Sequence, residues 1–175
     1  MDAQDIATLR AELEVLVAKE EIRVALAKFC RGMDRIDDDL AISVWAPGAR
    51  ASYDGIFEGT GEDLCRQSGE THRRRFRAHA HEISNCLIEV AGDRAASETY
   101  VTASVLSDTA GKHVVTTVHG RYLDRWIRHE GRWLIEDRRF VRIFSYDQLV
   151  GATLGADERS PADASYDLFR AFKTT

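Results

Sequence analysis

The sequence has little proline, the residue that interrupts helices and strands, and it has no long apolar run. Only 2 of its 175 residues are proline, while 44% are hydrophobic and 30% are charged. Disordered and fibrous chains differ sharply from this composition, so both classes are excluded. No stretch approaches the roughly 18 consecutive apolar residues of a membrane-spanning helix, and residues 1–5 are acidic where a signal peptide is basic. We therefore expect no membrane association and a cytoplasmic location.

Cysteine is also scarce. Cys30, Cys65 and Cys86 are odd in number, widely spaced and without a CxxC pairing. A disulfide framework needs an even set, and a structural zinc site needs paired ligands at short spacing. The sequence therefore predicts free, buried thiols.

Positive charge is in deficit. The 24 basic and 29 acidic residues give a formal charge of −5, and the one basic run is 72–77 (HRRRFR). Nucleic-acid-binding domains usually carry a basic excess with interleaved aromatic residues, so we expect no nucleic-acid partner. The run is expected to complement a helix dipole or to steer a substrate carboxylate. GxGxxG, P-loop, GxSxG and HExxH patterns are absent, and we expect no cofactor and no metal.

Periodic apolar residues predict helices in the first third of the chain. A first helix is indicated by apolar spacings of three and four at Ile6, Leu9, Leu13 and Leu16, which Ile22, Leu26 and Phe29 continue in a similar stripe. Gly32 is expected to end this helix. A short helix is predicted over 38–45, before Pro47, and another over 62–75 with Thr60 as its N-cap.

From residue 78 onward the pattern changes to strands. After strand-like content at 49–57, four β-rich runs follow at about 81–90, 94–107, 113–129 and 132–146, separated by short links that contain glycine. Such links are typical of hairpins, so we expect an antiparallel meander. The length fits one domain over 1–150, and residues 151–175 are expected to form a tail with a closing helix near 163–172.

Helices followed by a twisted antiparallel sheet define an α+β fold. The simplest way to bury the helical stripe is to lay it in the concave face of the curved sheet, which gives a cone-shaped α+β barrel with an interior pocket. The long strands extend beyond what three helices cover. We therefore expect the other sheet face and the early heptad-like stripe to support a homodimer or homotrimer.

The order of several short motifs is similar to that of one family. The motifs are 29–35 (FCRGMDR), 41–45 (AISVW), 53–55 (YDG), 58–64 (EGTGEDL), 79–85 (HAHEISN), 120–124 (GRYLD) and 131–139 (GRWLIEDRR). Together they resemble the SnoaL-like branch of the nuclear transport factor 2 (NTF2)-like superfamily. This resemblance implies a cystatin-like fold. The branch includes the cofactor-free lyases scytalone dehydratase, γ-hexachlorocyclohexane dehydrochlorinase and bile acid 7α-dehydratase, and the superfamily also includes isomerases and binding modules.

The resemblance also implies a pair of catalytic residues. In those lyases a carboxylate at the end of the first helix pairs with a histidine that enters the long sheet, and Asp34 and His81 occupy the matching positions. An imidazole, with an ordinary pKa of about 6.5, suits proton removal near neutral pH. A carboxylate on its other nitrogen fixes the tautomer. His81 is therefore the expected base and Asp34 the residue that orients it.

Four further residues match pocket positions of the same lyases. Tyr53 falls where scytalone dehydratase has a pocket tyrosine, and Arg138 matches the pocket arginine of the dehydrochlorinase. Trp45 and Asn85 also align with residues of that enzyme. The tyrosine phenol could donate to a leaving oxygen, and the arginine could hold a negative charge. The resemblance thus implies substrate binding by these four residues.

Each residue also has a structural interpretation. Asp34 could be a solvated carboxylate or a cap, and Arg138 could pair with Asp124 or Glu136. Tyr53 and Trp45 could be core aromatics, and Asn85 could satisfy backbone groups.

The histidines leave a further alternative open. His79 and His81 share one face of a strand and could be metal ligands, which His119 could join only through cross-strand pairing.

The residues and the resemblance together predict a cofactor-independent lyase, of the dehydratase or β-elimination type, for a hydrophobic cyclic or aromatic small molecule. An isomerase or a C–C-cleaving enzyme could use the same base. The alternative is a non-catalytic protein, either a small-molecule binder or an assembly subunit similar to the small subunit of ring-hydroxylating dioxygenases. That alternative predicts that Asp34 and His81 do not touch.

Overall fold

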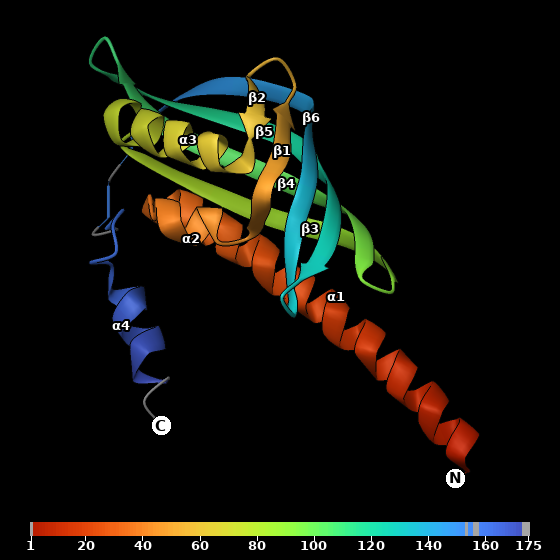
Figure 1. Ribbon diagram of the computed structural model, residues 1–175. Coiled ribbons are helices and arrows are strands. Elements are labelled where there is room, and N and C mark those ends of the chain that lie inside the picture. Colours follow the sequence, from red (N-terminus) through yellow and green to blue (C-terminus); the bar gives the residue numbers. More distant parts are fainter. Residues whose placement is uncertain (1, 153, 156–157, 173–175) are drawn as a thin grey trace.

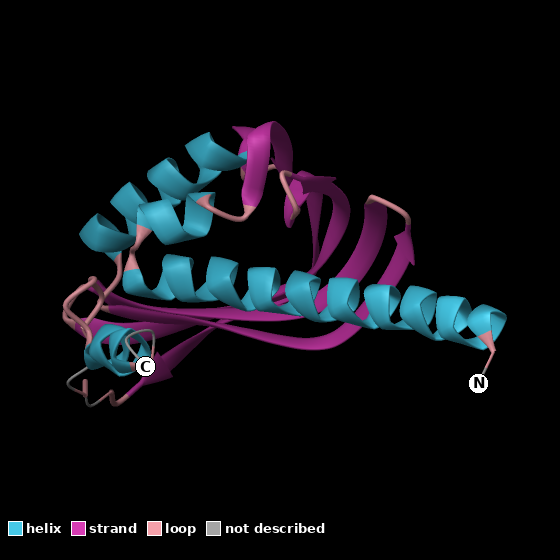
Figure 2. Ribbon diagram, turned by 60° about the horizontal axis from the view of Figure 1, so that its bottom comes forward, coloured by secondary structure: helices cyan, strands magenta, loops and turns pink. Residues whose placement is uncertain are grey.

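The computed structural model describes residues 2–152, 154–155 and 158–172. Its elements are α1 (Ala3–Arg35), α2 (Asp38–Ile42), β1 (Trp45–Tyr53), β2 (Phe57–Thr60), α3 (Gly61–Arg75), β3 (Ala78–Ala91), β4 (Arg94–Thr109), β5 (Lys112–His129), β6 (Arg132–Val150) and α4 (Ala164–Ala171). The strands form one six-stranded sheet in the order β2-β1-β6-β5-β4-β3 (Figure 1). Figure 2 shows this sheet curving around one side of α1, with α2 and α3 on the other side of that helix.

Tight turns join the four long strands. β3, β4, β5 and β6 pair consecutively and antiparallel. Ala110-Gly111 and Glu130-Gly131 have positive φ at both turn positions, as type I′ hairpins require. The predicted meander is confirmed.

The sheet as a whole is mixed and open. β1 pairs parallel with β6, while β2 pairs antiparallel with β1 at one edge. The α+β class is confirmed, but the sheet is not antiparallel throughout and does not close into a barrel within the described residues. Strand β2, helix α3 and strands β3 to β5 separate β1 from β6 in the chain, so the relative direction of β1 and β6 is set by this whole connection and not by one turn.

Helix α1 continues past Gly32, so the expectation that this glycine ends the helix is wrong. The helix begins with a capping box between Asp2 and Asp5 and ends at Ile36, which adopts the left-handed conformation. Gly32 is needed for close approach instead, because a Cβ built there would lie 2.5 Å from the backbone nitrogen of Ala41 in α2. The extra turn carries Asp34.

The two apolar stripes of α1 lie on different faces. At about 100° per residue, Ile22 follows Ile6 by sixteen residues and therefore lies about 160° around the helix. Ile22, Leu26 and Phe29 are buried against the sheet, whereas Ile6 is more than half exposed. The expectation of one similar stripe is wrong, since the spacing from Leu16 to Ile22 does not fit a single face.

The second and third helices begin as predicted, and one boundary shifts. Thr60 caps α3, because its hydroxyl accepts a hydrogen bond of 3.1 Å from the Asp63 backbone. α2 ends at Ile42, and Trp45 belongs to β1 rather than to a helix. Its neighbour Val44 accepts a 2.9 Å backbone bond from Ile135, which ties this segment to β6.

The main core fills the space between α1 and the concave sheet face. Phe29 and Leu26 of α1 pack there with Trp126 and Ile135 of the sheet, and all four are almost fully buried. The three cysteines are free, with Cys30 and Cys65 buried and Cys86 half-buried. No helix in the described part of the chain is long and apolar enough to cross a membrane.

Candidate active site

Asp34 and His81 lie in direct contact. Asp34 is in the last turn of α1, and His81 is in β3, near the start of that strand. The Asp34 Oδ1 atom lies 2.7 Å from His81 Nδ1, and Oδ2 accepts a 3.1 Å hydrogen bond from the His81 backbone nitrogen. The two side chains are only 18% and 10% exposed, so bulk water screens the pair weakly. The structure therefore brings the two residues of the expected dyad together.

This contact assigns different tasks to the two ring nitrogens of His81. A carboxylate next to Nδ1 favours the tautomer in which Nδ1 carries the proton and donates it to Asp34. Nε2 then keeps its lone pair and can accept a proton from another molecule. The arrangement is chemically suited to general-base catalysis.

Two further histidines pack against His81. The ring centres of His79 and His72 lie 6.3 and 6.4 Å from that of His81. His79 also contacts the Met33 carbonyl through Nε2 at 2.8 Å. Burial lowers the pKa of His79 and lowers that of His72 to about 3. Both neighbours are therefore neutral near pH 7, which avoids a second positive charge beside the dyad.

Arg138 is fully buried and paired with Asp124. Its Nε and Nη2 atoms lie 2.6 and 2.8 Å from the two carboxylate oxygens of Asp124, and both side chains are inaccessible to solvent. The two residues are direct cross-strand partners on β5 and β6. The structural pairing considered for Arg138 is therefore present, and Arg139, the next residue, points outward.

Aromatic rings surround the Arg138 guanidinium. Its carbon lies 3.9 Å from the ring centre of Tyr122, 4.5 Å from that of Phe29 and 5.4 Å from that of Trp45. The third nitrogen, Nη1, is buried without a hydrogen-bond partner among the described residues. This nitrogen is a charged donor whose hydrogen-bonding capacity is unused by the described residues.

Tyr53 and Trp45 also have buried polar atoms in this region. Neither the Tyr53 hydroxyl nor the Trp45 Nε1 atom has a hydrogen-bond partner in the described chain. Tyr53 stacks on Phe140 at 5.3 Å between ring centres. Burial raises the pKa of Tyr53, an effect that the nearby Arg138 opposes in part. The phenol therefore stays protonated and can act as a donor.

The dyad and the buried ion pair lie near the same thiol. Cys30 precedes Asp34 by one helical turn, and burial raises the Cys30 pKa to about 12. The charges of Arg138, Asp34 and Asp124 all act on this thiol as smaller effects.

Asn85 and His119 lie elsewhere. Asn85 is exposed and occupies a bulge of β3 with a φ of 25°, so the structure does not bring it into the buried cluster. Asn85 is the extra residue of the bulge. Its side chain therefore does not share the inward-facing side of the strand with Ile83 and Cys86, which are half-buried. His119 pairs with Thr102, whereas His81 pairs with the adjacent Ala103, so the two histidines point to opposite sheet faces. Among the described residues no set of three His, Cys, Asp or Glu side chains is placed to hold a metal ion.

The sequence interpretation assigned no site role to His72. We grouped it with the basic run that follows, yet its ring lies only 4.5 Å from that of His79. Its position on α3 carries a signal, because Cys65 and Gly69 are buried seven and three residues before it. This spacing continues the inner face of the helix.

The fold and the placement of these residues define the class of protein. N-terminal helices that lie in the concave face of a curved sheet are shared with a solved NTF2-like protein with a cystatin-like fold from Novosphingobium aromaticivorans. It is 20% identical, with a TM-score of 0.61 over 81% of this chain and 92% of that one. The chain belongs to the SnoaL-like domain family, whose profile matches residues 14–139. The family resemblance of the sequence motifs is confirmed.

Two other solved structures have the same fold. A putative scytalone dehydratase from N. aromaticivorans is 21% identical, with a TM-score of 0.67 over 81% of this chain and 94% of that one. A hexachlorocyclohexane dehydrochlorinase of type 2 is 15% identical, with a TM-score of 0.66 over 81% and 94%. No curated protein matches this sequence. At these identities the likeness establishes the fold.

Proposed function

We propose that the protein is a cofactor-independent lyase of the dehydratase or β-elimination type. Its substrate would be a hydrophobic cyclic or aromatic small molecule. His81 Nε2 takes a proton from carbon, and the electron pair of that C–H bond forms a double bond. The leaving group departs from the neighbouring carbon with its bonding electrons. Asp34 stabilises the imidazolium that forms.

One observation carries this proposal, the 2.7 Å contact between Asp34 and His81. The pair is mostly shielded from water, and the second carboxylate oxygen holds the His81 backbone. A base fixed in tautomer and position accelerates proton transfer by about 10²–10⁴-fold. The solved neighbours named as dehydratase and dehydrochlorinase support the same reaction class.

The buried donors supply the second half of the reaction. We assign Tyr53 and Arg138 Nη1 to the leaving group or to the negative charge that develops on it, because both are buried without a partner in the described chain. Trp45 contributes an apolar wall and an indole N–H. Asn85 remains a proposal only for a substrate that extends to the bulge of β3.

The alternative functions differ in what they require of this site. A non-catalytic binder or assembly subunit does not need a hydrogen-bonded acid and imidazole, so the dyad contact favours an enzyme. An isomerase uses the same first step and returns the proton elsewhere, and it is separated from a lyase by the products.

A model elimination tests the proposal before the natural substrate is known. The probe is 5-nitrobenzisoxazole, which opens to a coloured cyanophenolate when a base removes its ring C–H proton and the N–O bond breaks. We expect the protein to exceed an equal concentration of free imidazole. His81→Gln should lower the rate by about 10²–10⁴-fold without a change in melting temperature.

His119→Gln is the matched control, because it removes a histidine from the opposite sheet face. It should keep the wild-type rate. The proposal is wrong if the wild-type protein is no faster than imidazole, or if His81→Gln and His119→Gln have the same rate.

A further inference from the structure

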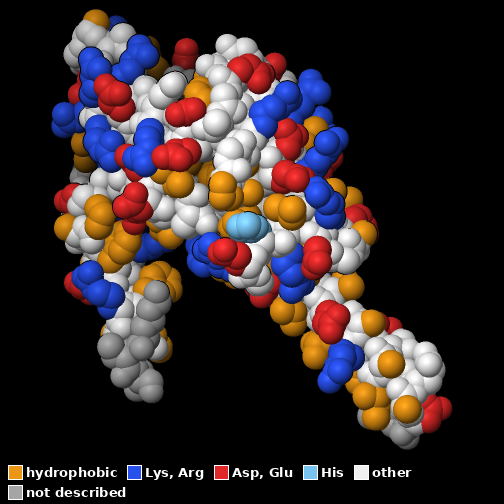
Figure 3. Space-filling view, viewed as in Figure 1, with side chains coloured by type: hydrophobic (Ala, Val, Ile, Leu, Met, Phe, Trp, Pro, Cys, Tyr) orange, Lys and Arg blue, Asp and Glu red, His pale blue; other side chains and the backbone are white. Residues whose placement is uncertain are grey.

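A groove with a basic lining lies beside the histidine cluster. It lies between the end of α3, the end of β4 and the tail after β6, and its volume is about 670 Å³. Five arginines line it, namely Arg73, Arg74, Arg75, Arg77 and Arg159, against two acidic residues, Asp108 and Glu158. The lining therefore has an excess of three positive charges in a chain whose net charge is −5. Figure 3 shows basic side chains gathered over α3, interspersed with acidic ones.

Two of these arginines keep unused binding capacity. Arg75 is exposed and makes no hydrogen bond or ion pair with a described residue. Arg159 is half-buried, and among the described residues it contacts neutral groups, the His72 carbonyl and His79 Nδ1, each at 3.4 Å. An arginine that lacks an anionic partner is suited to bind carboxylate or phosphate through two parallel hydrogen bonds. The other three arginines each have a carboxylate within 3.6 Å.

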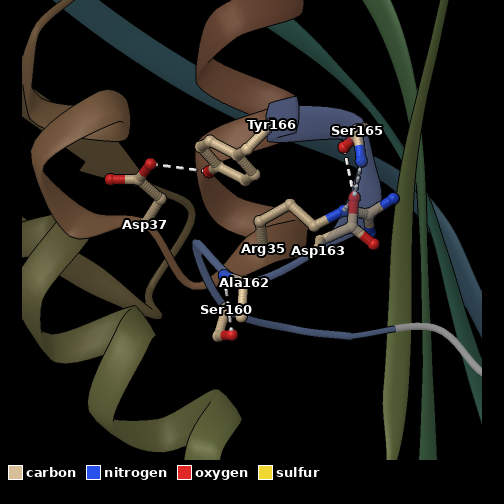
Figure 4. Close-up of polar contacts among 7 residues, drawn as sticks. All are labelled: Arg35, Asp37, Ser160, Ala162, Asp163, Ser165 and Tyr166. Atoms are coloured by element: carbon tan, nitrogen blue, oxygen red, sulfur yellow. Dashed lines mark hydrogen bonds and ion pairs between the residues drawn. The ribbon is translucent and has the colours of Figure 1, made fainter. Parts of the chain in front are cut away.

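Contacts of the tail hold Arg159 in place. Figure 4 shows the chain around α4 docked on the end of α1. Tyr166 donates a 2.6 Å hydrogen bond to Asp37, and Arg35 lies 3.4 Å from Asp163. Asp163 is the N-cap of α4 and follows Arg159 by four residues, so the chain is anchored on α1 close to this arginine.

The same arginine links the groove to the dyad. Its Nη1 atom contacts His79, and the His79 ring centre is 6.3 Å from that of His81. Arg159 is therefore separated from the base of the dyad by a single imidazole ring. An apolar molecule without a charged group would leave the arginines unused.

We propose that this groove binds the carboxylate or phosphate group of an anionic substrate, with Arg75 and Arg159 as the binding cations. The apolar part of the same molecule then reaches His81, so this inference rests on the proposed function of the dyad.

Calorimetric titration with matched aromatic probes tests the groove. The probes are 2-naphthoate, 2-naphthyl phosphate and the neutral 2-naphthamide. We expect at least one anion to bind about tenfold more tightly than the amide at low salt, as charge-assisted hydrogen bonds predict. The more tightly bound anion identifies the preferred group. Arg75→Gln and Arg159→Gln should each reduce this preference, whereas Arg125→Gln, an exposed arginine on β5, should leave it unchanged.

Equal binding of all three probes would contradict the proposed anion site. An equal loss of the anion preference in Arg125→Gln and Arg159→Gln would also contradict it. His81→Gln separates the two proposals, because it removes the base and leaves the arginines. If its anion preference persists and the wild-type protein fails the model elimination, only the proposed reaction is wrong. If the elimination succeeds and the anion preference is absent, only the groove is wrong.

The outer face of α1 carries an independent feature, a stripe of exposed aliphatic side chains. Its members are 43–63% exposed and are Ile6, Leu9, Leu13, Leu16, Val17 and Val24. The first half of α1 extends beyond the sheet, and orange side chains mark it at the lower right of Figure 3. Isolated helices of roughly 12–15 residues are marginal in water, so packing against another surface would stabilise this half.

The stripe leads into a groove on the body of the same chain. The groove has a volume of about 420 Å³, and its apolar lining comes from Val17, Val24 and Ala25 of α1 together with Val44, Trp133 and Leu134. Ile6 and Val24 are eighteen residues apart, which is five helical turns, so they lie on one line. A helix with this stripe matches this groove in chemistry.

Charge complementarity selects the orientation of such a helix. Two α1 helices can pair antiparallel with Ile6 of one opposite Val24 of the other and Leu13 opposite Val17. In this register the numbers of two facing residues add up to about 30. Arg10 then comes next to Glu21, and Asp5 next to Arg23, and each of these pairs is of opposite charge.

We infer that a second copy of this chain covers the stripe, in a two-fold antiparallel pair of α1 helices. Size-exclusion chromatography with light scattering should give a dimer for the wild-type protein and a monomer for Leu13→Glu. Ala11→Glu, about 160° around the helix from Leu13, should remain dimeric. A double variant, Leu13→Cys with Val17→Cys, should form a cross-linked dimer on mild oxidation. A wild-type monomer or trimer, or dissociation by Ala11→Glu, would overturn the pairing.

Discussion

Asp34 contacts His81 through both of its carboxylate oxygens, one on the ring and one on the backbone. These contacts join the last turn of α1 to the start of β3 through the backbone nitrogen and the Nδ1 atom of His81. The backbone bond fixes β3 relative to the helix, and the ring contact holds the imidazole in one orientation on that strand. The carboxylate therefore positions the base and stabilises its charged form at the same time.

Asp34→Asn should separate these two effects. The amide oxygen can still accept from the His81 backbone, but the variant has no negative charge to stabilise an imidazolium. We expect the rate of the model elimination to fall about 10²-fold, with the melting temperature nearly unchanged. Asp39→Asn, an exposed carboxylate in α2, is the control and should keep full activity. Equal activity of Asp34→Asn and wild type would remove Asp34 from the mechanism.

The buried Arg138–Asp124 pair should be strongly coupled in stability. Asp124→Asn leaves the Arg138 guanidinium buried and without its counter-charge, a change that typically costs about 3–5 kcal/mol. Arg138 stays charged: burial, the largest single effect, lowers its pKa, but Asp124, Tyr53 and Tyr122 together raise it by more. The double change Asp124→Leu with Arg138→Met should cost less than Asp124→Asn alone. Urea unfolding of the variants checks this, and additive losses in the double-mutant cycle would contradict it.

Local patterns in the sequence could predict most of this architecture. Glycine-containing links mark the hairpins at 110–111 and 130–131, because a two-residue turn needs positive φ at both positions. The Asp34–His81 pair could be located as well, since ordered motifs fix both ends of it. These features depend on short stretches of chain or on family motifs.

Long-range register could not be predicted in the same way. The pairing of Arg138 with Asp124 rather than Glu136 depends on which residues of β5 and β6 face each other, and the pair shifts register between Arg125 and Trp126. The approach of His72 to His79 depends on how α3 docks, and the parallel contact of β1 with β6 joins segments far apart in sequence. Each requires the assembled tertiary structure.

The low pKa of His72 should make the protein sensitive to acid. Burial, followed by the neighbouring His79, His81 and Arg159, lowers the pKa of His72 to about 3, whereas an unfolded histidine has a pKa of about 6.5. Between these two values the unfolded chain binds the proton and the folded chain does not. The contribution of His72 to stability is therefore complete above about pH 6.5 and is lost as the pH falls toward 3.

His72→Gln removes this effect and should flatten the acid limb of the stability curve. Between pH 7 and pH 4 the free energy of unfolding should fall less for His72→Gln than for the wild type. The difference between the two losses should be on the order of 3 kcal/mol. Urea unfolding at both pH values measures the difference. His129→Gln, at an exposed position in β5, should follow the wild-type curve. Parallel acid limbs for wild type and His72→Gln would show that His72 titrates normally.

Gly32→Ala should destabilise the protein although it replaces glycine inside a helix. In an exposed helix this change would stabilise by about 1 kcal/mol. At Gly32 the new Cβ would lie 2.5 Å from the Ala41 nitrogen and 2.8 Å from its Cα, and these backbone atoms belong to α2. Helix α2 would have to shift away from α1, so we expect a net loss of about 1–3 kcal/mol, the usual range for overpacking.

Gly69→Ala is the matched control for this argument. Its Cβ would also meet an obstacle, at 2.1 Å, but the obstacle is the Oδ1 atom of Asp38, the far end of a side chain that can rotate. That movement would disturb only the exposed ion pair with Arg73, which contributes about 0–1 kcal/mol. Thermal and urea unfolding of both variants should therefore rank Gly32→Ala as clearly less stable than Gly69→Ala. The reverse order would mean that α2 can move more freely than its contacts with α1 suggest, and that close packing at Gly32 does not fix the turn carrying Asp34.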